Sequence, residues 1–201
     1  MKGSKALLRF SGCSVFLIAL LLGVIAWKFP NQGKEPYSIW ANFVASGWMG
    51  DGEQGDKYVQ LQEACEDKAR SDSLCLKIVY TPGPVGWAGV YWQNEPDNWG
   101  NVAGKNFLKT GYTKITFWAR GENGREVVEF KAGGINSPGK KYKDSFMVTS
   151  GKIILKKVWN KYTLDLTNNN LVSVIGGFCW VVSRSGNPNG LTFYLDDMQF
   201  E

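Results

Sequence analysis

A series of short segments in which apolar and polar residues alternate is the feature that most constrains the fold of this chain. A period of two is typical of β-strands with one buried face, and turn-forming stretches such as TPGP and GENG separate the segments. No amphipathic helix of about ten residues or more is evident after residue 36. Strands without intervening helices predict an all-β fold, either a β-sandwich or a jelly roll. The segments are SIWANF, KYVQLQ, CLKIVY, GWAGVYWQ, TKITFWAR, REVVEFKA, VWNKYTLDL, SVIGGFCWVV and LTFYLDDMQF.

Length and composition limit the chain to one main domain without histidine chemistry. The chain has 201 residues, which suits one sandwich domain and a short extension. It contains no histidine, so Ser-His-Asp and Cys-His nucleophilic sites and His-containing zinc sites cannot be built within it. The formal net charge is +5, but lysines and acids are interspersed, and this pattern argues against binding to nucleic acid.

An uncharged apolar run over residues 10–27 follows Lys2, Lys5 and Arg9. This charge asymmetry is typical of a membrane anchor whose N-terminus stays in the cytosol, and also of a cleaved signal peptide. The domain is therefore expected outside the cytosol, either membrane-tethered (periplasmic or extracellular) or secreted. The predicted organisation is an anchor or signal peptide over residues 1–29, a linker over 30–36 and a β-sandwich domain over 37–201.

Two of the four cysteines, Cys65 and Cys75, flank the polar segment EDKARSDSL, which leads into a predicted strand. In an oxidising compartment this pair is predicted to form a disulfide that closes a loop. Two unpaired thiols are the alternative. The spacing does not match a CxxC redox motif.

An ordered set of segments carries a resemblance to a known family: GWAGVYWQ, NWGN, KITFWARGENG, VEFKAGGI, WNKYTLDL, VIGGFCWV and GLTFYLDDMQFE. The set resembles secreted bacterial domains with the galactose-binding-like jelly roll, the fold shared by many carbohydrate-binding modules. The likeness covers about residues 37–201. It implies a non-catalytic domain that binds glycans, and a structural calcium ion near the terminal strand.

Strand parity predicts which side chains point away from the core, because successive residues face opposite sides of a sheet. In GWAGVYWQ, Ala88, Val90 and Trp92 form the apolar set. The opposite set is aromatic and polar, and a sugar needs both a flat ring under its C–H face and polar partners for its hydroxyls. Trp99, in the loop EPDNWGN, is expected either to border a site or to pin the loop. The predicted ligand-binding residues are Trp87, Tyr91, Gln93, Trp118, Arg120, Glu129 and Lys131.

Two readings of these aromatic side chains stay open. They contact a ligand, or a long loop covers them, since large aromatic residues are commonly packed rather than exposed. Trp180 and Cys179 lie in a segment that is apolar in both parities, and both are assigned to the core.

The segment LTFYLDDMQF changes its apolar parity at Asp196-Asp197. A β-bulge at this pair would restore one continuous inner face, so a bulge is predicted there. Adjacent carboxylates can ligate Ca²⁺, which prefers oxygen ligands. The predicted calcium ligands are Asp51, Glu53, Asp56, Asp196 and Asp197. Aspartates that accept hydrogen bonds from turn amides are the alternative.

These observations predict non-catalytic binding of a polysaccharide or other glycan. A protein partner in the cell envelope, bound by the same surface, is the first alternative. The second is a carboxylate-dependent glycoside hydrolase, which needs two carboxyl groups across a cleft. Glu126 and Glu129 are three positions apart and would face opposite sides of a strand, so they cannot form that pair. An enzyme is therefore not expected.

Overall fold

The computed structural model describes residues 35–66, 68, 70 and 74–201. The predicted anchor or signal peptide over residues 1–29, and the first five residues of the linker, lie outside the described residues. Within the part that is described, no helix has the length and apolar character needed to cross a membrane.

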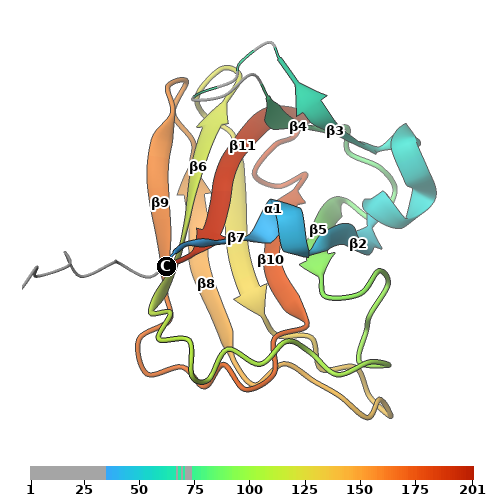
Figure 1. The fold of residues 1–201 in the computed structure, drawn as a ribbon. Helices are drawn as coiled ribbons and strands as arrows, with labels where there is room; N and C mark the ends of the chain where they lie inside the picture. Colours follow the sequence, from blue (N-terminus) through green and yellow to red (C-terminus); the bar gives the residue numbers. More distant parts are fainter. Residues whose placement is uncertain (1–34, 67, 69, 71–73) are drawn as a thin grey trace, which may run out of the picture. The chain divides into compact units, whose positions relative to one another are not determined.

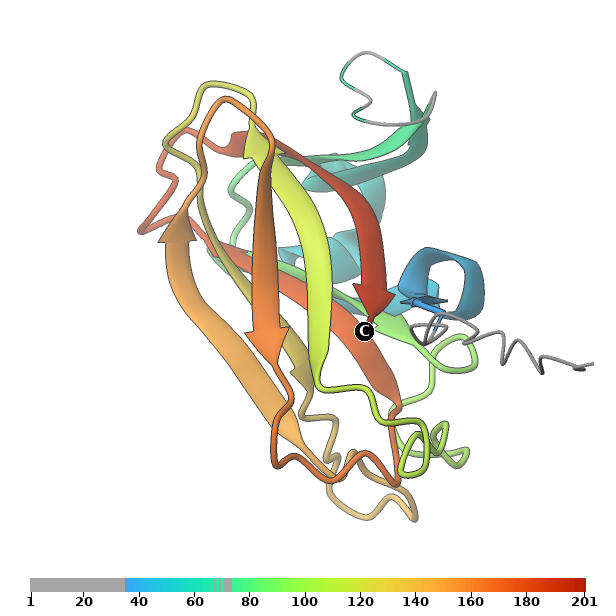
Figure 2. The same cartoon turned by 60° about the vertical axis from the view of Figure 1, so that its left-hand side comes forward.

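Two antiparallel sheets form the domain (Figure 1). Sheet A has the strand order β3-β4-β11-β6-β9, and β1 also pairs with β11. Sheet B has the order β2-β5-β10-β7-β8. The predicted all-β sandwich is thereby confirmed, and Figure 2 shows β9, β6 and β11 in front of strands of the other sheet. The strands are β1 (Tyr37–Ser38), β2 (Val44–Gly50), β3 (Val59–Cys65), β4 (Cys75–Tyr80), β5 (Trp87–Gln93), β6 (Lys114–Gly121), β7 (Val127–Gly133), β8 (Met147–Ile154), β9 (Asn160–Asp165), β10 (Gly176–Ser183) and β11 (Leu191–Phe200).

Four elements differ from what the sequence predicts. The segment SIWANF is mainly a short helix, α1 (Ile39–Asn42), because the Ser38 side chain accepts a hydrogen bond from the amide of Ala41 and caps it. Strands β2 and β8 were not expected. Their alternation is interrupted by small residues and glycine, and Gly151 in β8 has a positive φ of 64°. A 3₁₀ segment, η1 (Asp51–Lys57), follows β2.

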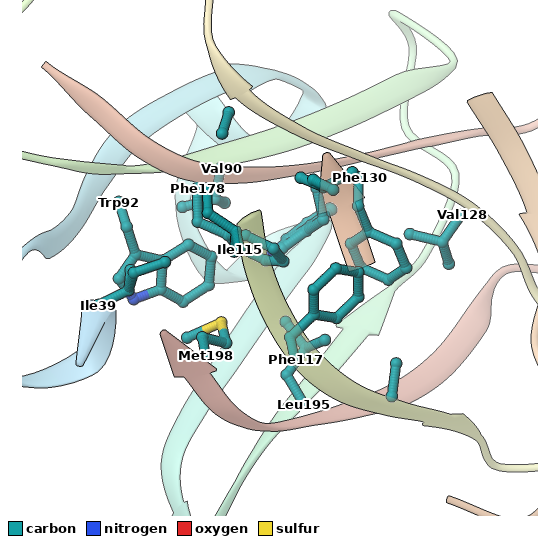
Figure 3. Close-up of a cluster of buried hydrophobic side chains, with 14 of the residues drawn as sticks. Ile39, Val90, Trp92, Ile115, Phe117, Val128, Phe130, Phe178, Leu195 and Met198 are labelled. Atoms are coloured by element: carbon teal, nitrogen blue, oxygen red, sulfur yellow. The ribbon is translucent and has the colours of Figure 1, made fainter. Parts of the chain in front are cut away.

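Aromatic rings from both sheets interlock in the core (Figure 3). Phe117 of β6 lies with its ring centroid 4.6 Å from that of Phe130 and 5.0 Å from that of Phe178, both in sheet B. Trp92 packs edge-on against Phe178 at 5.9 Å. Each such side chain contributes about 1.5–3 kcal/mol by leaving water. The inward sets predicted from parity are all buried: Ala88, Val90, Trp92, Ile115, Phe117, Ala119, Val128, Phe130 and Ala132.

The predicted β-bulge in β11 is confirmed. Pairing of β11 with β6 shifts register between Asp196 and Gln199, and Asp197 adopts a positive φ of 45°. Because of this shift, Met198 and Phe200 return to the buried side that Leu195 occupies before the bulge.

The disulfide predicted between Cys65 and Cys75 is wrong for this structure. Both cysteines are free and buried, although they lie directly opposite each other on β3 and β4. The thiol of Cys75 instead donates a hydrogen bond to the backbone oxygen of Cys65 at 3.0 Å. Burial, with this neighbour, raises the pKa of Cys75 to about 12, which keeps the thiol protonated.

Glu201 ties β11 to β6 and β9. Burial alone would raise the pKa of its carboxyl group, but bonds from Thr116 and Gln199 and ion pairs with Lys114 (3.0 Å) and Lys161 (3.2 Å) outweigh that effect. The pKa falls to about 2, from an ordinary value of 4.5. A depressed carboxyl pKa stabilises the fold above the ordinary value, and this contribution is lost as the pH falls through the lower value.

We expect the free energy of unfolding to decrease between pH 4.5 and about pH 2 with a contribution from Glu201. Glu201→Gln should lower the free energy of unfolding by about 1–2 kcal/mol at neutral pH. It should also make the free energy of unfolding depend less on pH in this range. Urea denaturation at a series of pH values measures both effects. Glu63→Gln, at an exposed glutamate on β3, is the matched control, and an equal change in the two variants would contradict the assignment.

Candidate functional site

The outer face of sheet B brings together most of the predicted ligand-binding residues. Cross-strand pairing places Met49, Gly89, Val181, Glu129 and Lys152 in one row that crosses all five strands. The next row is Gly47, Tyr91, Cys179, Lys131 and Thr149. Since neighbouring strands lie about 4.8 Å apart, the face is roughly 19 Å wide, enough for several sugar rings.

Trp87 is an exposed aromatic residue at the start of β5, with 37% of its surface accessible. Its ring lies against the backbone of Gly50, where an added Cβ would meet ring carbons at 3.0 Å and the Trp87 carbonyl oxygen at 2.4 Å. Gly50 has a positive φ of 62°, so glycine serves both the close approach and the backbone conformation here. Of the aromatic residues predicted to bind a ligand, Trp87 is the one whose exposure fits that prediction.

Asp51 holds the loop that precedes Trp87. Its carboxylate accepts hydrogen bonds from the amides of Gly83 (2.9 Å), Val85 (2.8 Å) and Gly86 (3.1 Å), and from the hydroxyl of Tyr80 (3.0 Å). Burial alone would raise the pKa of Asp51, but these four bonds outweigh it and lower the pKa. Asp51 is therefore a structural anion with its oxygens already occupied.

An open groove of about 620 Å³ lies at the β2 end of sheet B, and we call it the Trp99 groove. Its apolar lining is formed by Trp48, Met49 and Trp99, all partly buried. Two carboxylates, Glu53 and Asp97, are exposed at its border. The remaining lining residue is Ser46. Trp48 reaches the groove from the core side of β2, whereas Trp99 lies on the outer face, and an indole with polar neighbours is suited to a sugar ring.

Buried amide groups shape the loop that presents Trp99. The Asn98 side chain accepts hydrogen bonds from the amides of Gly100 and Val102 and donates to the carbonyl oxygens of Asn94 and Val102. Asn98 is itself only 2% exposed. These four bonds replace a regular turn and fix the direction of the next residue, Trp99.

The prediction that Gln93 contacts a ligand is wrong. Gln93 is fully buried, accepts a hydrogen bond from the Ser46 hydroxyl (2.8 Å) and donates to the backbone oxygen of Asn98 (3.0 Å). The Ser46 hydroxyl in turn accepts a bond from the Asp97 amide at 3.0 Å. Gln93 thus supports the loop from below, and its polar groups are unavailable to solvent.

Tyr91 also acts beneath the surface. It is 8% exposed, its hydroxyl donates to the carbonyl oxygen of Gly133 (3.0 Å), and burial raises its pKa. The Trp99 ring packs edge-on against it, with centroids 6.0 Å apart. The alternative reading of a loop-covered aromatic residue therefore applies to Tyr91, and Trp99 both covers Tyr91 and lines the groove.

Glu129 and Lys131 lie on the outer face of sheet B as predicted, toward the β8 end. Their side chains form an ion pair at 3.2 Å, and Glu129 accepts a hydrogen bond from the Thr149 hydroxyl at 2.7 Å. A smaller hollow nearby is lined by Glu129, Lys152 and Ser183, among other residues. The two ends of the face therefore differ in charge.

Trp118 and Arg120 are not on this face. Both belong to β6 and point outward from sheet A, on the opposite side of the sandwich. The Arg70 guanidinium lies 4.4 Å from the centre of the Trp118 ring and pairs with Asp197. Arg120 lies over the ring of Tyr194 at 5.5 Å. Parity within a strand does not reveal to which sheet the strand belongs, and for this reason the seven predicted residues are divided.

The five predicted calcium ligands do not come together. Among the residues that the structure describes, no group of three or more His, Cys, Asp or Glu side chains is placed to hold a metal ion. Asp51 uses its oxygens for backbone amides, whereas Asp196 and Asp197 form ion pairs with Arg70. Glu53 and Asp56 border a hollow beside Trp48. These residues do not fit a shared calcium ion.

Sequence reasoning missed Trp48, Met49 and Asp97 in the groove. Trp48 and Met49 belong to β2, in which alanine, serine and glycine interrupt the alternation of apolar and polar residues that would have predicted a strand. Asp97 precedes a tryptophan in a loop rich in amides, and a positive φ of 57° at Asp97 helps to turn that loop outward. An amide-rich loop that carries one aromatic residue is the signal that would have found this site.

Comparison with known proteins supports the fold. No family model and no curated protein matches the sequence. A crystal structure of a family 30 carbohydrate-binding module is similar with a TM-score of 0.55 and 13% identity, over 83% of this chain and 98% of that one. A family 11 module from Clostridium thermocellum, in complex with a β-1,3-1,4-mixed-linked tetrasaccharide, is similar with a TM-score of 0.54 and 11% identity. This match covers 83% of this chain and 94% of that one. The chain therefore has the two-sheet sandwich fold of carbohydrate-binding modules.

We expect Asn98→Ala to lower the free energy of unfolding by about 2 kcal/mol, because it leaves buried backbone groups without partners. Urea denaturation followed by tryptophan fluorescence measures the loss. Asn101→Ala, in the same loop, is the control, since the Asn101 side chain is exposed and accepts a bond from Lys140. Equal stability of the two variants would show that Asn98 does not hold the loop.

Proposed function

We propose that this protein is a non-catalytic module that binds a polysaccharide across the outer face of sheet B, with the Trp99 groove as its main subsite. The observation that carries the proposal is the open groove at the β2 edge of the sheet, which Trp99 and Met49 line from the outer face and Trp48 lines from the core side of β2, beside exposed polar groups. The fold, which matches that of non-catalytic carbohydrate-binding modules, supports it.

The binding mode follows from the chemistry of the face. Pyranose rings would stack their C–H faces on the exposed surfaces of Trp99 and Trp87, and apolar contacts of this kind need no movement of the sheet. Hydroxyl groups at the ring edges would bond to Asp97, Ser183 and Glu129. The underlying Gln93 and Asn98 keep the loop in place, so little conformational entropy is lost on binding.

We further propose that residues 10–27 tether this domain to a membrane, or direct its secretion, so that the sandwich lies outside the cytosol. The uncharged run after three basic residues supports this placement. A module held at the cell surface would meet extracellular or envelope glycans there.

A hydrolase remains less well supported than a binding module. Glu126 accepts bonds from the amides of Asn123 (2.7 Å) and Arg125 (2.9 Å) and closes a turn. Glu129 is held by Lys131 and Thr149. Neither carboxylate is placed as a free general acid across a cleft from a partner.

We expect Trp99→Ala to weaken polysaccharide binding by about tenfold or more, because it removes a stacking surface. Affinity electrophoresis of the full chain in gels that contain soluble polysaccharides measures this. Trp99→Phe should weaken polysaccharide binding less than Trp99→Ala does, since a smaller aromatic ring remains. Trp87→Ala should weaken binding at the neighbouring position.

Trp118→Ala is the matched control, because it removes the same side chain from the outer face of sheet A. Its binding should equal that of the wild type. Circular dichroism establishes that each variant is folded. Equal retardation of the Trp99→Ala and wild-type chains would place the site elsewhere, and binding to a stable protein partner with no retardation by any polysaccharide would favour the scaffold alternative.

A further inference from the structure

Negative charge is concentrated in the segments that build one end of the face. Residues 35–56 and 78–104 contain six acidic residues and no lysine or arginine. These segments include β2, η1 up to Asp56, β5 and the Trp99 loop, and Lys57 follows as the last residue of η1. The domain itself is balanced, since five of the 23 lysines and arginines lie in residues 1–34, which leaves 18 against 18 acidic residues. The local charge is therefore a property of this end of the sandwich.

Glu53 and Asp97 bring this charge to the Trp99 groove. Both are exposed, and both line the groove together with Trp48 and Trp99. Within the described part of the chain, neither carboxylate forms an ion pair with a lysine or arginine. Glu53 also lines the hollow on the other side of Trp48, with Asp56. The groove thus combines indole faces with carboxylates that pair with no lysine or arginine of residues 35–66, 68, 70 and 74–201.

The described cations closest in sequence or space to the groove have other contacts, and the Lys57 ammonium at the end of η1 lies 4.9 Å from the centre of the Tyr58 ring. Lys140, on a loop next to the Trp99 loop, donates to the side-chain oxygen of Asn101 at 2.7 Å. Lys131 is paired with Glu129 on β7. Among the described residues that line the groove, none is a lysine or arginine.

From these observations we propose that the Trp99 groove selects a glycan that carries protonated amino groups, such as a de-N-acetylated hexosamine polymer. This inference rests on the proposed function and names its ligand class. An ammonium group is attracted by the face of an indole and by a nearby carboxylate, whereas an amide or hydroxyl substituent gains less from either. Uronate and sulfate groups would be repelled by Glu53 and Asp97.

Because the chain as a whole is positively charged, general electrostatic attraction does not favour a cationic polymer. Any preference for one must come from a local site. The preference should also weaken as salt is added, since the two carboxylates are exposed and are screened over about a Debye length.

The test compares three β-1,4-linked oligosaccharides of equal length that differ at carbon 2: glucosamine, N-acetylglucosamine and glucose. Isothermal titration calorimetry of the full chain is performed where the amines are protonated and the carboxylates are ionised. We expect the glucosamine oligomer to bind about fivefold or more tightly than the other two. Glu53→Gln combined with Asp97→Asn should reduce the ratio of the glucosamine affinity to the glucose affinity to about one, whatever change it makes to the affinity for the glucose oligomer itself.

The double variant Glu63→Gln with Glu66→Gln is the matched control, because it removes two exposed carboxylates at the end of β3 in sheet A. It should keep the preference. Equal binding of the three oligomers, or a preference that survives in the Glu53 and Asp97 double variant, would overturn the inference and leave polysaccharide binding intact. Absence of binding to every oligomer and polysaccharide would overturn the proposed function as well.

Discussion

The contact of Phe117 with Phe130 and Phe178 across the sandwich determines which faces of the strands point outward. Once these rings pack together, the two-residue period of each strand fixes the face of the sheet on which every remaining side chain lies. A slip of one residue in β5 would bury Trp87 and expose Val90. The outer face of sheet B, with its rows of cross-strand neighbours, is therefore a consequence of the core rather than a separate feature of the fold.

A second layer of organisation lies between the core and the groove. Buried polar side chains, chiefly Gln93, Asn98 and Asp51, bond to backbone groups of the loops on either side of β5. Buried polar groups are costly unless they are paired, so each of them favours one loop conformation over others. In this way the sheet specifies the positions of Trp87 and Trp99, although both lie at its margins.

Much of the fold could be predicted from the sequence, because β4, β6 and β7 alternate between buried and partly exposed positions for most of their length and bury their apolar sets. The candidate site was less accessible. Parity showed that Gln93 and Tyr91 point outward from the sheet, but it could not show that a loop covers them. It also could not assign Trp118 to the opposite sheet, because strand pairing depends on contacts distant in sequence. The bulge at Asp196 was predictable from a local change of parity, whereas a shared calcium site required two distant segments to meet.

The roles of the buried carboxylates bear on whether the domain is a catalyst. Burial raises the pKa of Asp144 to about 6, a shift that an active-site acid would also show. Yet Asp144 is 8% exposed, and its oxygens accept bonds from the amides of Ile135, Ile175 and Gly176, which join a loop to β10. Glu126 and Asp51 likewise accept backbone amides. These buried acids support loops, whereas Glu53 and Asp97 at the Trp99 groove are exposed to solvent, so a raised carboxyl pKa in this domain marks a structural position rather than the groove.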